Sequence, residues 1–262
     1  MFVDLEERIR KEEKISSFIN NVVILEKIDS TNSYAKQLKD QVDGTLIVAK
    51  EQTQGRGRNN RTWKSFGEKN LTFSLIVNYP EDKEALGLFS LLSANSVAAT
   101  IEELGLIPEI KWPNDILINS RKVSGVLCEA VFDNNKPRSL IIGIGLNVNS
   151  NKDDFYSDDF VYRLEPTSLS IEGNKEYSSN NLLVILIRNL INWITLFKLK
   201  KYETILSFWR SRWIDIGSEL VVTQDQMVLK GNAIDINSKG ELLFLEKETK
   251  KVHVLNSGEL ST

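Results

Sequence analysis

A short basic loop between two apolar runs places the strongest constraint on this chain. Residues 51–63 contain three arginines, two glycines and a tryptophan, and apolar residues dominate the flanking runs 45–50 and 71–78. Glycine permits backbone angles that other residues avoid and exposes amide N–H groups. Arginine offers a planar, permanently charged fork that suits carboxylate and phosphate. The loop indicates an anion-binding site on a framework of strands, although a solvated basic hairpin explains these residues alone equally well.

The scarcity of cysteine and histidine narrows the chemistry that such a site performs. The chain has one cysteine, Cys128, and one histidine, His253, near its C-terminus. It can form no internal disulfide and no zinc site of the Cys/His kind, and a Ser-His-Asp or Cys-His mechanism would depend on His253. We expect Cys128 to be a small buried strand residue and His253 a barrel residue. Chemistry is therefore expected to rest on arginine, lysine, aspartate, backbone amides and a cofactor or metal ion.

Charge and hydropathy exclude several broad classes. The 262 residues carry a formal net charge of −3, which argues against a general binder of nucleic acid or anionic membranes. Residues 1–10 lack the apolar core of a signal peptide. The most apolar segment, 182–197, is interrupted by Arg188, Asn189 and Asn192, and a bilayer span needs about 20 apolar residues. We expect a cytoplasmic protein that does not bind membranes.

The first two thirds of the chain alternate strand patterns with a few helices. An N-terminal amphipathic helix is expected over 3–19, and Asp29 or Ser30 is expected to cap a short helix that continues to Leu38. A long helix with an apolar stripe is predicted over 84–104. This succession predicts an α+β fold, a mixed sheet with helices on one face. The predicted strands are 22–28, 45–50, 71–78, one around Ile110 that Pro113 breaks and that resumes at Asp115, 122–132 and 138–147.

The last third divides into two parts. Residues 150–180 are polar and read as a long surface connection in which only 165–169 is anchored, and helices are predicted over 181–197 and 200–213. After Asp215, short alternating runs are punctuated by glycines, which is typical of a small all-β barrel of about five strands. We therefore predict a catalytic domain over 1–214 and a small C-terminal domain over 215–262.

Four separated stretches carry a more specific signal. No P-loop occurs, and neither Gly55-x-Gly57 nor Gly143-Ile144-Gly145 continues as a dinucleotide fingerprint. In their order and intervals, however, four stretches closely resemble the biotin protein ligases. They are 55–63 (Gly-Arg-Gly-Arg-x-x-Arg-x-Trp), 111–115 (Lys-Trp-Pro-Asn-Asp), 122–129 (Lys-x-x-Gly-Val-Leu-x-Glu) and 143–149 (Gly-Ile-Gly-Leu-Asn-Val-Asn). The resemblance runs from about Val22 to the C-terminus.

The resemblance implies a two-step, ATP-dependent ligation. Biotin and ATP would give biotinyl-5′-AMP and pyrophosphate, and a lysine of a biotin carboxyl carrier protein would then attack the mixed anhydride. It also implies a catalytic domain like those of class II synthetases and lipoate ligases, followed by an SH3-like barrel. The residues before the first strand are too few for a three-helix DNA-binding domain, so we expect a monofunctional ligase without a DNA partner. Relatives make both a monomer and a homodimer possible.

The resemblance also assigns roles to individual residues. The first step joins a carboxylate to a polyanion, so positioned cations and Mg²⁺ must neutralise charge. By resemblance, Arg58 and Lys122 are the catalytic residues, and Asp115 is the expected Mg²⁺ ligand. The residues implied for biotin are Ser30, Thr31, Asn32, Gln52, Gly55, Arg56, Gly57, Arg58, Lys122 and Gly125. Those implied for ATP are Arg58, Arg61, Trp63, Lys111, Asn114, Asp115, Lys122 and Asn147.

Each assignment has a plain structural alternative. Ser30 to Asn32 are typical helix-capping residues, Lys122 could be a turn lysine, and Trp63 could be a core aromatic residue. Two other functions also stay open from the residues alone. One is a lipoate-type acyl ligase of the same fold. The other is a nucleic-acid-binding module that uses the arginines of the loop together with Lys64, which predicts strongly salt-dependent binding.

Overall fold

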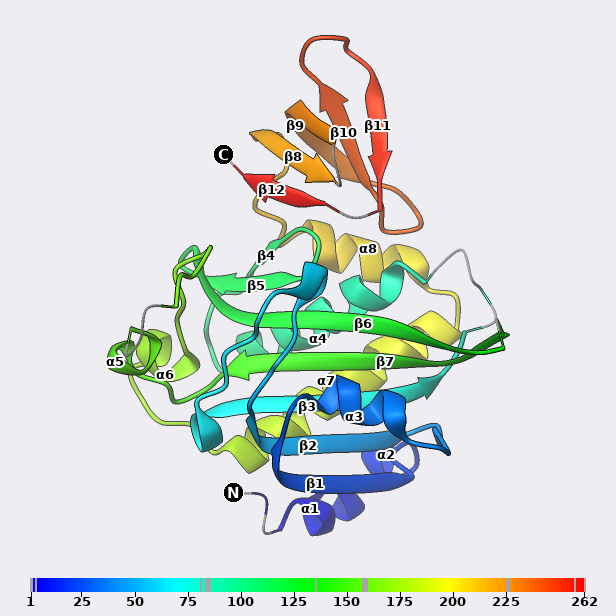
Figure 1. Cartoon of the computed structure of the whole chain (residues 1–262), viewed down its shortest axis with the longest axis vertical. Helices are drawn as coiled ribbons and strands as arrows, with labels where there is room; N and C mark the ends of the chain where they lie inside the picture. Colours follow the sequence, from blue (N-terminus) through cyan, green and yellow to red (C-terminus); the bar gives the residue numbers. More distant parts are fainter. Residues whose placement is uncertain are drawn as a thin grey trace.

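Seven strands form one mixed sheet at the centre of the computed structural model, which describes all residues except 1, 3, 81, 83–85, 135, 157–159, 225, 226, 257 and 262. The strands follow the order β1-β2-β3-β7-β6-β5-β4. β1 and β2 are parallel and the other neighbours are antiparallel, so the predicted mixed sheet is confirmed. The bounds are β1 Asn21–Ile28, β2 Thr45–Gln52, β3 Asn70–Asn78, β4 Glu109–Lys111, β5 Asp115–Ile118, β6 Arg121–Asp133 and β7 Lys136–Asn147 (Figure 1).

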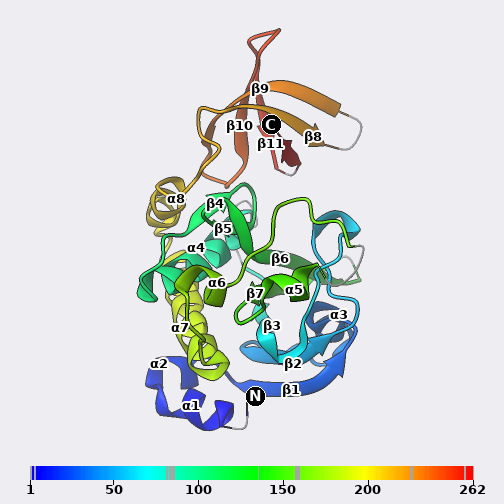
Figure 2. The same cartoon turned by 90° about the vertical axis from the view of Figure 1, so that its left-hand side faces the viewer.

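Helices cover the two faces of this sheet unequally. The long helices α4 (Leu88–Glu103) and α7 (Ser179–Lys198) lie on one face, together with α8 (Tyr202–Arg210), whereas α3 (Thr31–Gln37) lies on the other (Figure 2). Most of the buried apolar residues form one core, which lies between the sheet and the long helices and continues into the C-terminal residues, for example at Leu220 and Phe244. A smaller cluster, which comprises Ala35, Ile47, Ile76 and Ile141, holds α3 against the opposite face. α3 covers only part of that second face, and loops of the chain can cover the rest.

Several helix boundaries differ from the sequence predictions. The single helix expected over 3–19 is wrong: α1 (Leu5–Lys11) and α2 (Glu13–Ser16) are separated by Glu12, whose backbone is extended at φ −95° and ψ 102°. Leu5, Ile9 and Ile15 are nevertheless buried, so the apolar pattern identified the packed residues correctly. α4 begins at Leu88, while residues 84 and 85 of the predicted helix lie outside the described residues. α8 is shorter than the helix predicted over 200–213.

α7 is long and apolar enough, by length and composition, to cross a membrane. The helix has 20 residues and extends beyond the apolar segment 182–197 at both ends, so the expectation that it is too short was wrong. In this fold, 61% of its apolar window is buried, and the helix packs against α4. It is therefore a core helix of this structure.

The segment 150–180 is more ordered than its polar composition predicts. It contains two short helices, α5 (Lys152–Phe155) and α6 (Leu169–Gly173), and Phe155 is buried. The expected anchor at 165–169 is present: Lys122 N donates to Glu165 O at 2.7 Å, and Thr167 N donates to Lys122 O at 2.8 Å. This pairing attaches the segment to the start of β6.

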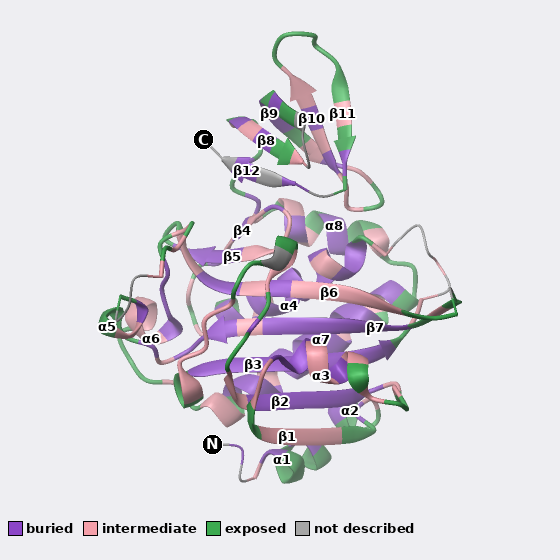
Figure 3. Ribbon diagram, in the orientation of Figure 1, coloured by how far each residue is buried: buried purple, intermediate pink, exposed green. Residues whose placement is uncertain are grey.

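The C-terminal residues form a second sheet of five antiparallel strands in the order β11-β10-β9-β8-β12. The bounds are β8 Glu219–Gln224, β9 Met227–Ile236, β10 Leu242–Glu246, β11 Val252–Leu255 and β12 Glu259–Ser261. All five lie after residue 214, where the sequence predicts a boundary, and the barrel prediction of about five strands is confirmed. Figure 3 shows that β2, β3 and β7 are mostly buried, whereas β1 and β6 are mostly intermediate and β11 is partly exposed.

Ile142 on β7 tests the main core, because it faces α4 and is 0% exposed. We expect Ile142→Ala to lower the free energy of unfolding by about 2–5 kcal/mol through lost burial and the remaining cavity. Ile107→Ala is the matched control, since Ile107 is 80% exposed and its truncation should change stability by less than about 0.5 kcal/mol. Urea titration followed by circular dichroism measures both, and equal shifts of the two midpoints would contradict this packing.

Candidate active site

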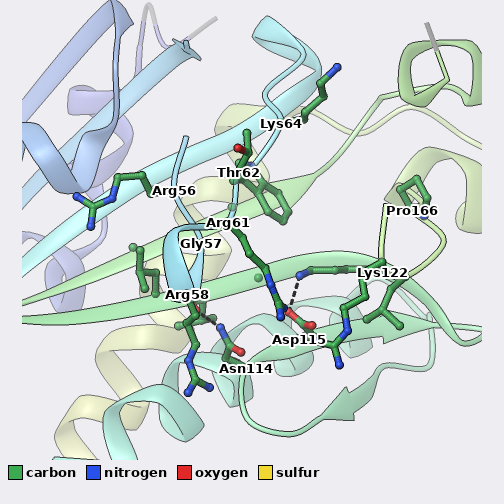
Figure 4. A pocket seen from close by; sticks show the side chains of 18 of the residues that line it. Arg56, Gly57, Arg58, Arg61, Thr62, Lys64, Asn114, Asp115, Lys122 and Pro166 are labelled. Atoms are coloured by element: carbon green, nitrogen blue, oxygen red, sulfur yellow. Dashed lines mark hydrogen bonds and ion pairs between the residues drawn. The ribbon is translucent and has the colours of Figure 1, made fainter. Parts of the chain in front are cut away.

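A cavity of about 500 Å³ lies on the face of the sheet that carries α3. Its walls come from the end of β2, from β7, β6, β5 and β4 in their order across the sheet, and from the basic loop. Neutral polar groups from the start of α3 and the end of β2 line one side. Charged groups line the other side, where Asp115 and Lys122 lie close to Arg61 of the loop (Figure 4). The sheet order therefore places stretches that are distant in sequence around one space.

The neutral side is a buried hydrogen-bond network at the start of α3. Ser30 is the N-cap, since its side chain accepts from Ser33 N at 3.5 Å, so the capping alternative is true for this residue. Gln52 Oε1 accepts from Thr31 N at 2.7 Å and from Thr31 Oγ1 at 3.0 Å. Ser74 Oγ, on β3, lies 2.7 Å from Thr31 Oγ1. These side chains are held before any ligand arrives, which favours recognition of an uncharged polar group.

Asn32 is fixed on both sides of its carboxamide. Its Oδ1 accepts from Ser74 Oγ at 2.5 Å, while its Nδ2 donates to Leu127 O at 3.2 Å and to Glu129 Oε2 at 2.9 Å. The carboxamide lies directly on β7, where a Cβ at Gly143 would meet Asn32 Oδ1 at 2.3 Å. Gly143 therefore has no side chain because a side chain from α3 occupies that place.

The basic loop folds back on itself as a tight hairpin. Gly57 N donates to Arg61 O, and Trp63 N donates to Gly55 O, both at 2.8 Å. The turn between them is a short 3₁₀ helix, Arg58–Asn60, in which Asn59 has a φ of +51°. Gly55 is required because a Cβ there would lie 2.4 Å from Trp63 O. The two ends of the loop are thus held together by backbone contacts.

The arginines of the loop point in different directions. Arg56 points away from Arg58 and Arg61 (Figure 4), and its Nη2 lies 2.8 Å from Glu129 Oε1. Arg58 and Arg61 both line the cavity, and burial lowers the pKa of each guanidinium from its usual value. Both remain charged, because an arginine pKa is too high for deprotonation in proteins. Arg58 is half-buried. Among the described residues it forms no ion pair, although the charge of Asp115 opposes the effect of burial on the pKa of its guanidinium.

Trp63 closes the loop against the sheet. A Cβ at Gly145 would meet Trp63 Cε2 at 2.4 Å, and one at Gly125 would meet Trp63 Cζ3 at 3.3 Å. The indole therefore lies on two glycines of neighbouring strands, β6 and β7. Its Nε1 is buried without a hydrogen-bond partner within the described part of the chain. A side chain rather than backbone thus occupies the space beside Gly145, as at Gly143.

The charged side of the cavity centres on Lys122 and Asp115. Lys122 Nζ lies 2.5 Å from Asp115 Oδ1 and 5.9 Å from the centre of the Trp63 ring. Lys122 is the second residue of the long strand β6 and pairs with the anchored segment around Pro166, so its backbone is fixed as well. Asn114 is attached to Val126 through both its side chain and its backbone carbonyl. A positioned lysine and a carboxylate thus face the two cavity arginines.

Two further predicted nucleotide contacts also have partners within the fold. Lys111 Nζ lies 2.8 Å from Asp215 Oδ1, in the link to the second sheet. Asn147 Oδ1 accepts from Asn70 Nδ2 at 2.7 Å, and Asn147 Nδ2 donates to Thr167 O at 2.9 Å. Both residues line the cavity. Their roles toward a nucleotide stay predictions, and the same contacts give each residue a structural role.

The donor set fits a magnesium ion that arrives with phosphate. Asp115 is the only carboxylate among the described residues that line the cavity, and the described residues contain no group of three side chains suited to hold a metal ion. Mg²⁺ in nucleotide sites is usually held by one or two carboxylates together with substrate phosphates and waters. Asp115 meets that requirement, although Lys122 competes for the same oxygen.

Almost all of the residues predicted from the sequence surround the cavity. Gly55 is the exception, since it lies behind the loop against Trp63 and does not line the cavity. Sequence reasoning missed Ser74, a buried serine in an apolar strand, where the interruption of the apolar pattern was the available signal. It included Glu129 in the stretch 122–129 but gave it no role. It also missed wall residues from 155–164 and from the second sheet, for which no local signal exists. These include Phe155, Tyr162, Arg163, Gly258 and Leu260.

Comparisons with known proteins identify relatives of this arrangement. Residues 24–147 match the model of the biotin/lipoate A/B protein ligase family. The chain is 32% identical over 230 residues to the bifunctional ligase/repressor BirA of Bacillus subtilis, with 86% of this chain and 70% of that protein covered. It is 29% identical over 212 residues to the biotin–[acetyl-CoA-carboxylase] ligase of Mycobacterium tuberculosis, with 77% and 73% covered.

A solved structure gives the same picture. The biotin protein ligase from Aquifex aeolicus in complex with biotin and ATP superposes with a TM-score of 0.76 at 29% sequence identity. The match covers 93% of this chain and 98% of the Aquifex chain. It therefore includes both the seven-stranded sheet and the smaller C-terminal sheet.

The contact between Trp63 and Gly145 leads to a direct test. Gly145→Ala puts a methyl group where the indole lies, so we expect Trp63 to move into solvent and acrylamide quenching of its fluorescence to rise. Gly57→Ala is the control, because its Cβ would lie 3.6 Å from Arg61 Cβ, an ordinary contact. The Trp63 signal is obtained as the difference from the same variants that also carry Trp63→Phe. Unchanged quenching in Gly145→Ala would contradict the placement of the indole.

Proposed function

Because the chain belongs to the biotin/lipoate A/B protein ligase family, we propose that it activates biotin with ATP and attaches it to a lysine of a biotin carboxyl carrier protein. Biotinyl-5′-AMP is the intermediate, and pyrophosphate and AMP are the leaving groups of the two steps. One observation carries the proposal: a single cavity joins a neutral, pre-formed hydrogen-bond network to a pair of positioned cations, Arg58 and Lys122. Biotin has one neutral polar end and one carboxylate end, and the cavity matches both.

The neutral network suits the ureido ring of biotin. Thr31, Asn32 and Gln52 are held by one another and by Ser74, and Ser30 is held by its cap contact with Ser33 N. Little side-chain freedom is therefore lost when a ligand binds. A network of neutral donors and acceptors also discriminates against a ring without polar groups, because its own groups would then be buried unpaired. This supports biotin over lipoate, whose dithiolane ring has no hydrogen-bonding groups.

The cations suit the first chemical step. The biotin carboxylate attacks the α-phosphorus of ATP, the new C–O–P bond forms, and the bond to pyrophosphate breaks. Arg58 and Lys122 line the region where the two anions must meet, and there they reduce the repulsion between them and stabilise negative charge at phosphorus. Mg²⁺ bound to the phosphates, with Asp115 as its protein ligand, would supply further charge neutralisation. No histidine or cysteine is needed for this step.

The second step needs an intact anhydride. The amine of the carrier lysine attacks the biotinyl carbonyl, an amide bond forms, and AMP leaves. Water competes with the amine, so a closed loop over the adenylate protects it. The hairpin of residues 55–63 covers the cavity with Arg58 and Trp63 on its inner side. Trp63, Arg61, Lys111, Asn114 and Asn147 are proposed to contact the nucleotide.

The relatives support the acceptor and the setting of the reaction. Proteins named biotin–[acetyl-CoA-carboxylase] ligase act on a carboxylase, so the acceptor proposed here is the biotin carrier of such an enzyme, in the cytoplasm. Binding to nucleic acid through the loop is a weaker candidate. Arg56 is engaged with Glu129, and Arg58 is largely enclosed in the cavity, so the loop does not present its charges on one surface.

Acid-dependent ATP–pyrophosphate exchange tests the proposed function directly. We expect exchange in the presence of biotin and none with lipoate or without an added acid, because only biotin satisfies the neutral network. Exchange with lipoate alone would identify a lipoate-type ligase. No exchange with either acid, together with salt-dependent binding to nucleic acid, would overturn the assignment.

Arg58 is expected to retain the adenylate. In Arg58→Gly the loss of a charge-assisted hydrogen bond, about 1.5–3 kcal/mol, should raise the release of free biotinyl-AMP by about 10- to 150-fold. Released adenylate would also label lysines of unrelated proteins. Arg10→Gly, at an exposed arginine of α1, is the control and should release the adenylate as the unmodified chain does. Equal retention in both variants would rule out the proposed role of Arg58.

A further inference from the structure

Glu129, on β6, contacts both α3 and the basic loop, and these three segments are separate in the sequence. Its Oε1 lies 2.6 Å from Lys36 Nζ on α3 and 2.8 Å from Arg56 Nη2 in the loop, and its Oε2 accepts from Asn32 Nδ2 at 2.9 Å. The Glu129 side chain is only 16% exposed. Burial alone raises the pKa of its carboxyl, but the hydrogen bonds from Lys36 and Asn32 outweigh this and hold the pKa below its usual value. The carboxylate is therefore charged and can accept from all three partners.

This carboxylate determines which way the Asn32 carboxamide faces. Leu127 O and Glu129 Oε2 are both acceptors and lie on the Nδ2 side, whereas the hydroxyl of Ser74 lies on the Oδ1 side. Reversal of the carboxamide would place Oδ1 against two acceptors. Because Asn32 lines the neutral side of the cavity, this orientation also decides whether a ligand there meets a donor or an acceptor.

The same carboxylate attaches the loop to the sheet. Arg56 points away from Arg58 and Arg61 (Figure 4), and its Nη1 also lies 3.3 Å from Ser33 Oγ. Arg56 is two residues before Arg58 and is paired across the hairpin with Thr62. Displacement of Arg56 therefore moves the strand of the hairpin that leads into Arg58.

We propose that Glu129 is a positioning residue, which fixes the loop and the Asn32 carboxamide in one common arrangement. The acid-binding end of the cavity and the loop that covers the adenylate are then set by one side chain on β6. This inference rests on the proposed function for its kinetic consequences, but the attachment of the loop is a property of the ligand-free chain.

Glu129→Gln tests this with nearly the same side-chain shape. Glutamine has one acceptor oxygen for three donors, and its NH₂ group must face either Asn32 or the two cations. We expect the KM for biotin in pyrophosphate exchange to rise about tenfold, which corresponds to about 1.4 kcal/mol, with a smaller change in the KM for ATP. In the ligand-free chain, tryptic cleavage after Arg58 and Arg61 should become several-fold faster.

Lys36→Met is the matched control. It removes the third partner of Glu129 but leaves Arg56 and Asn32 in place, so both the KM for biotin and the rate of cleavage should stay within about twofold. A purely electrostatic or structural role of Glu129 predicts that Lys36→Met resembles Glu129→Gln, and that result would overturn the proposal.

A double-mutant cycle with Arg56→Gln completes the test. If Glu129 acts on the loop through Arg56, the effects of the two substitutions on cleavage are not additive; additive effects would overturn the proposal. If Glu129→Gln fails to fold, Arg56→Gln alone decides, since it must also accelerate cleavage after Arg58. A chain that shows no biotin-dependent exchange would refute the proposed function, while the cleavage rates would still decide whether Glu129 holds the loop.

Discussion

Two positions without side chains on β7 support the whole site. Gly143 and Gly145 are two residues apart, so both face the same side of the sheet. The Asn32 carboxamide occupies the space at the first position and the Trp63 indole occupies the space at the second. A residue from α3 and a residue from the basic loop are thus brought to adjacent steps of one strand. This strand therefore sets the spacing between the Asn32 carboxamide and the Trp63 indole.

The electrostatic design of the cavity is incomplete without a ligand. Arg58 is largely enclosed and forms no ion pair among the described residues, and burial lowers the pKa of its guanidinium. A half-buried charge without an ion-pair partner costs some folding free energy, so an anion that binds beside Arg58 would stabilise the chain. Arg56 has the opposite arrangement, because Glu129 already neutralises it. Two arginines that are separated by one glycine therefore have different purposes, one toward the ligand and one toward the fold.

The sequence predicted the elements that depend on local pattern and missed contacts that depend on the order of strands. The basic loop, the cap at Ser30 and the five-stranded tail follow from residues that are close in sequence, and all are present. Ser74 was missed, and Glu129 was given no role, because the importance of both arises from contact with Asn32, which is 42 and 97 residues away. The polar composition of 150–180 concealed the buried Phe155. The break at Glu12 has no proline or glycine signal, and only the packing of two short helices reveals it.

Asp215 ties the large sheet to the C-terminal sheet, so the cavity depends on residues beyond 214. It lies in the link to the second sheet, is buried, and accepts from Lys111 Nζ at 2.8 Å, from Trp112 N at 3.3 Å and from Trp213 Nε1 at 3.3 Å. Asp215, which follows α8 in the chain, therefore holds the start of the Lys-Trp-Pro-Asn-Asp stretch that lines the cavity. A polypeptide cut at residue 214 would leave the Lys111 ammonium in a poorly hydrated place with no counter-charge. The two sheets are separate in architecture, but the cavity wall belongs to both of them.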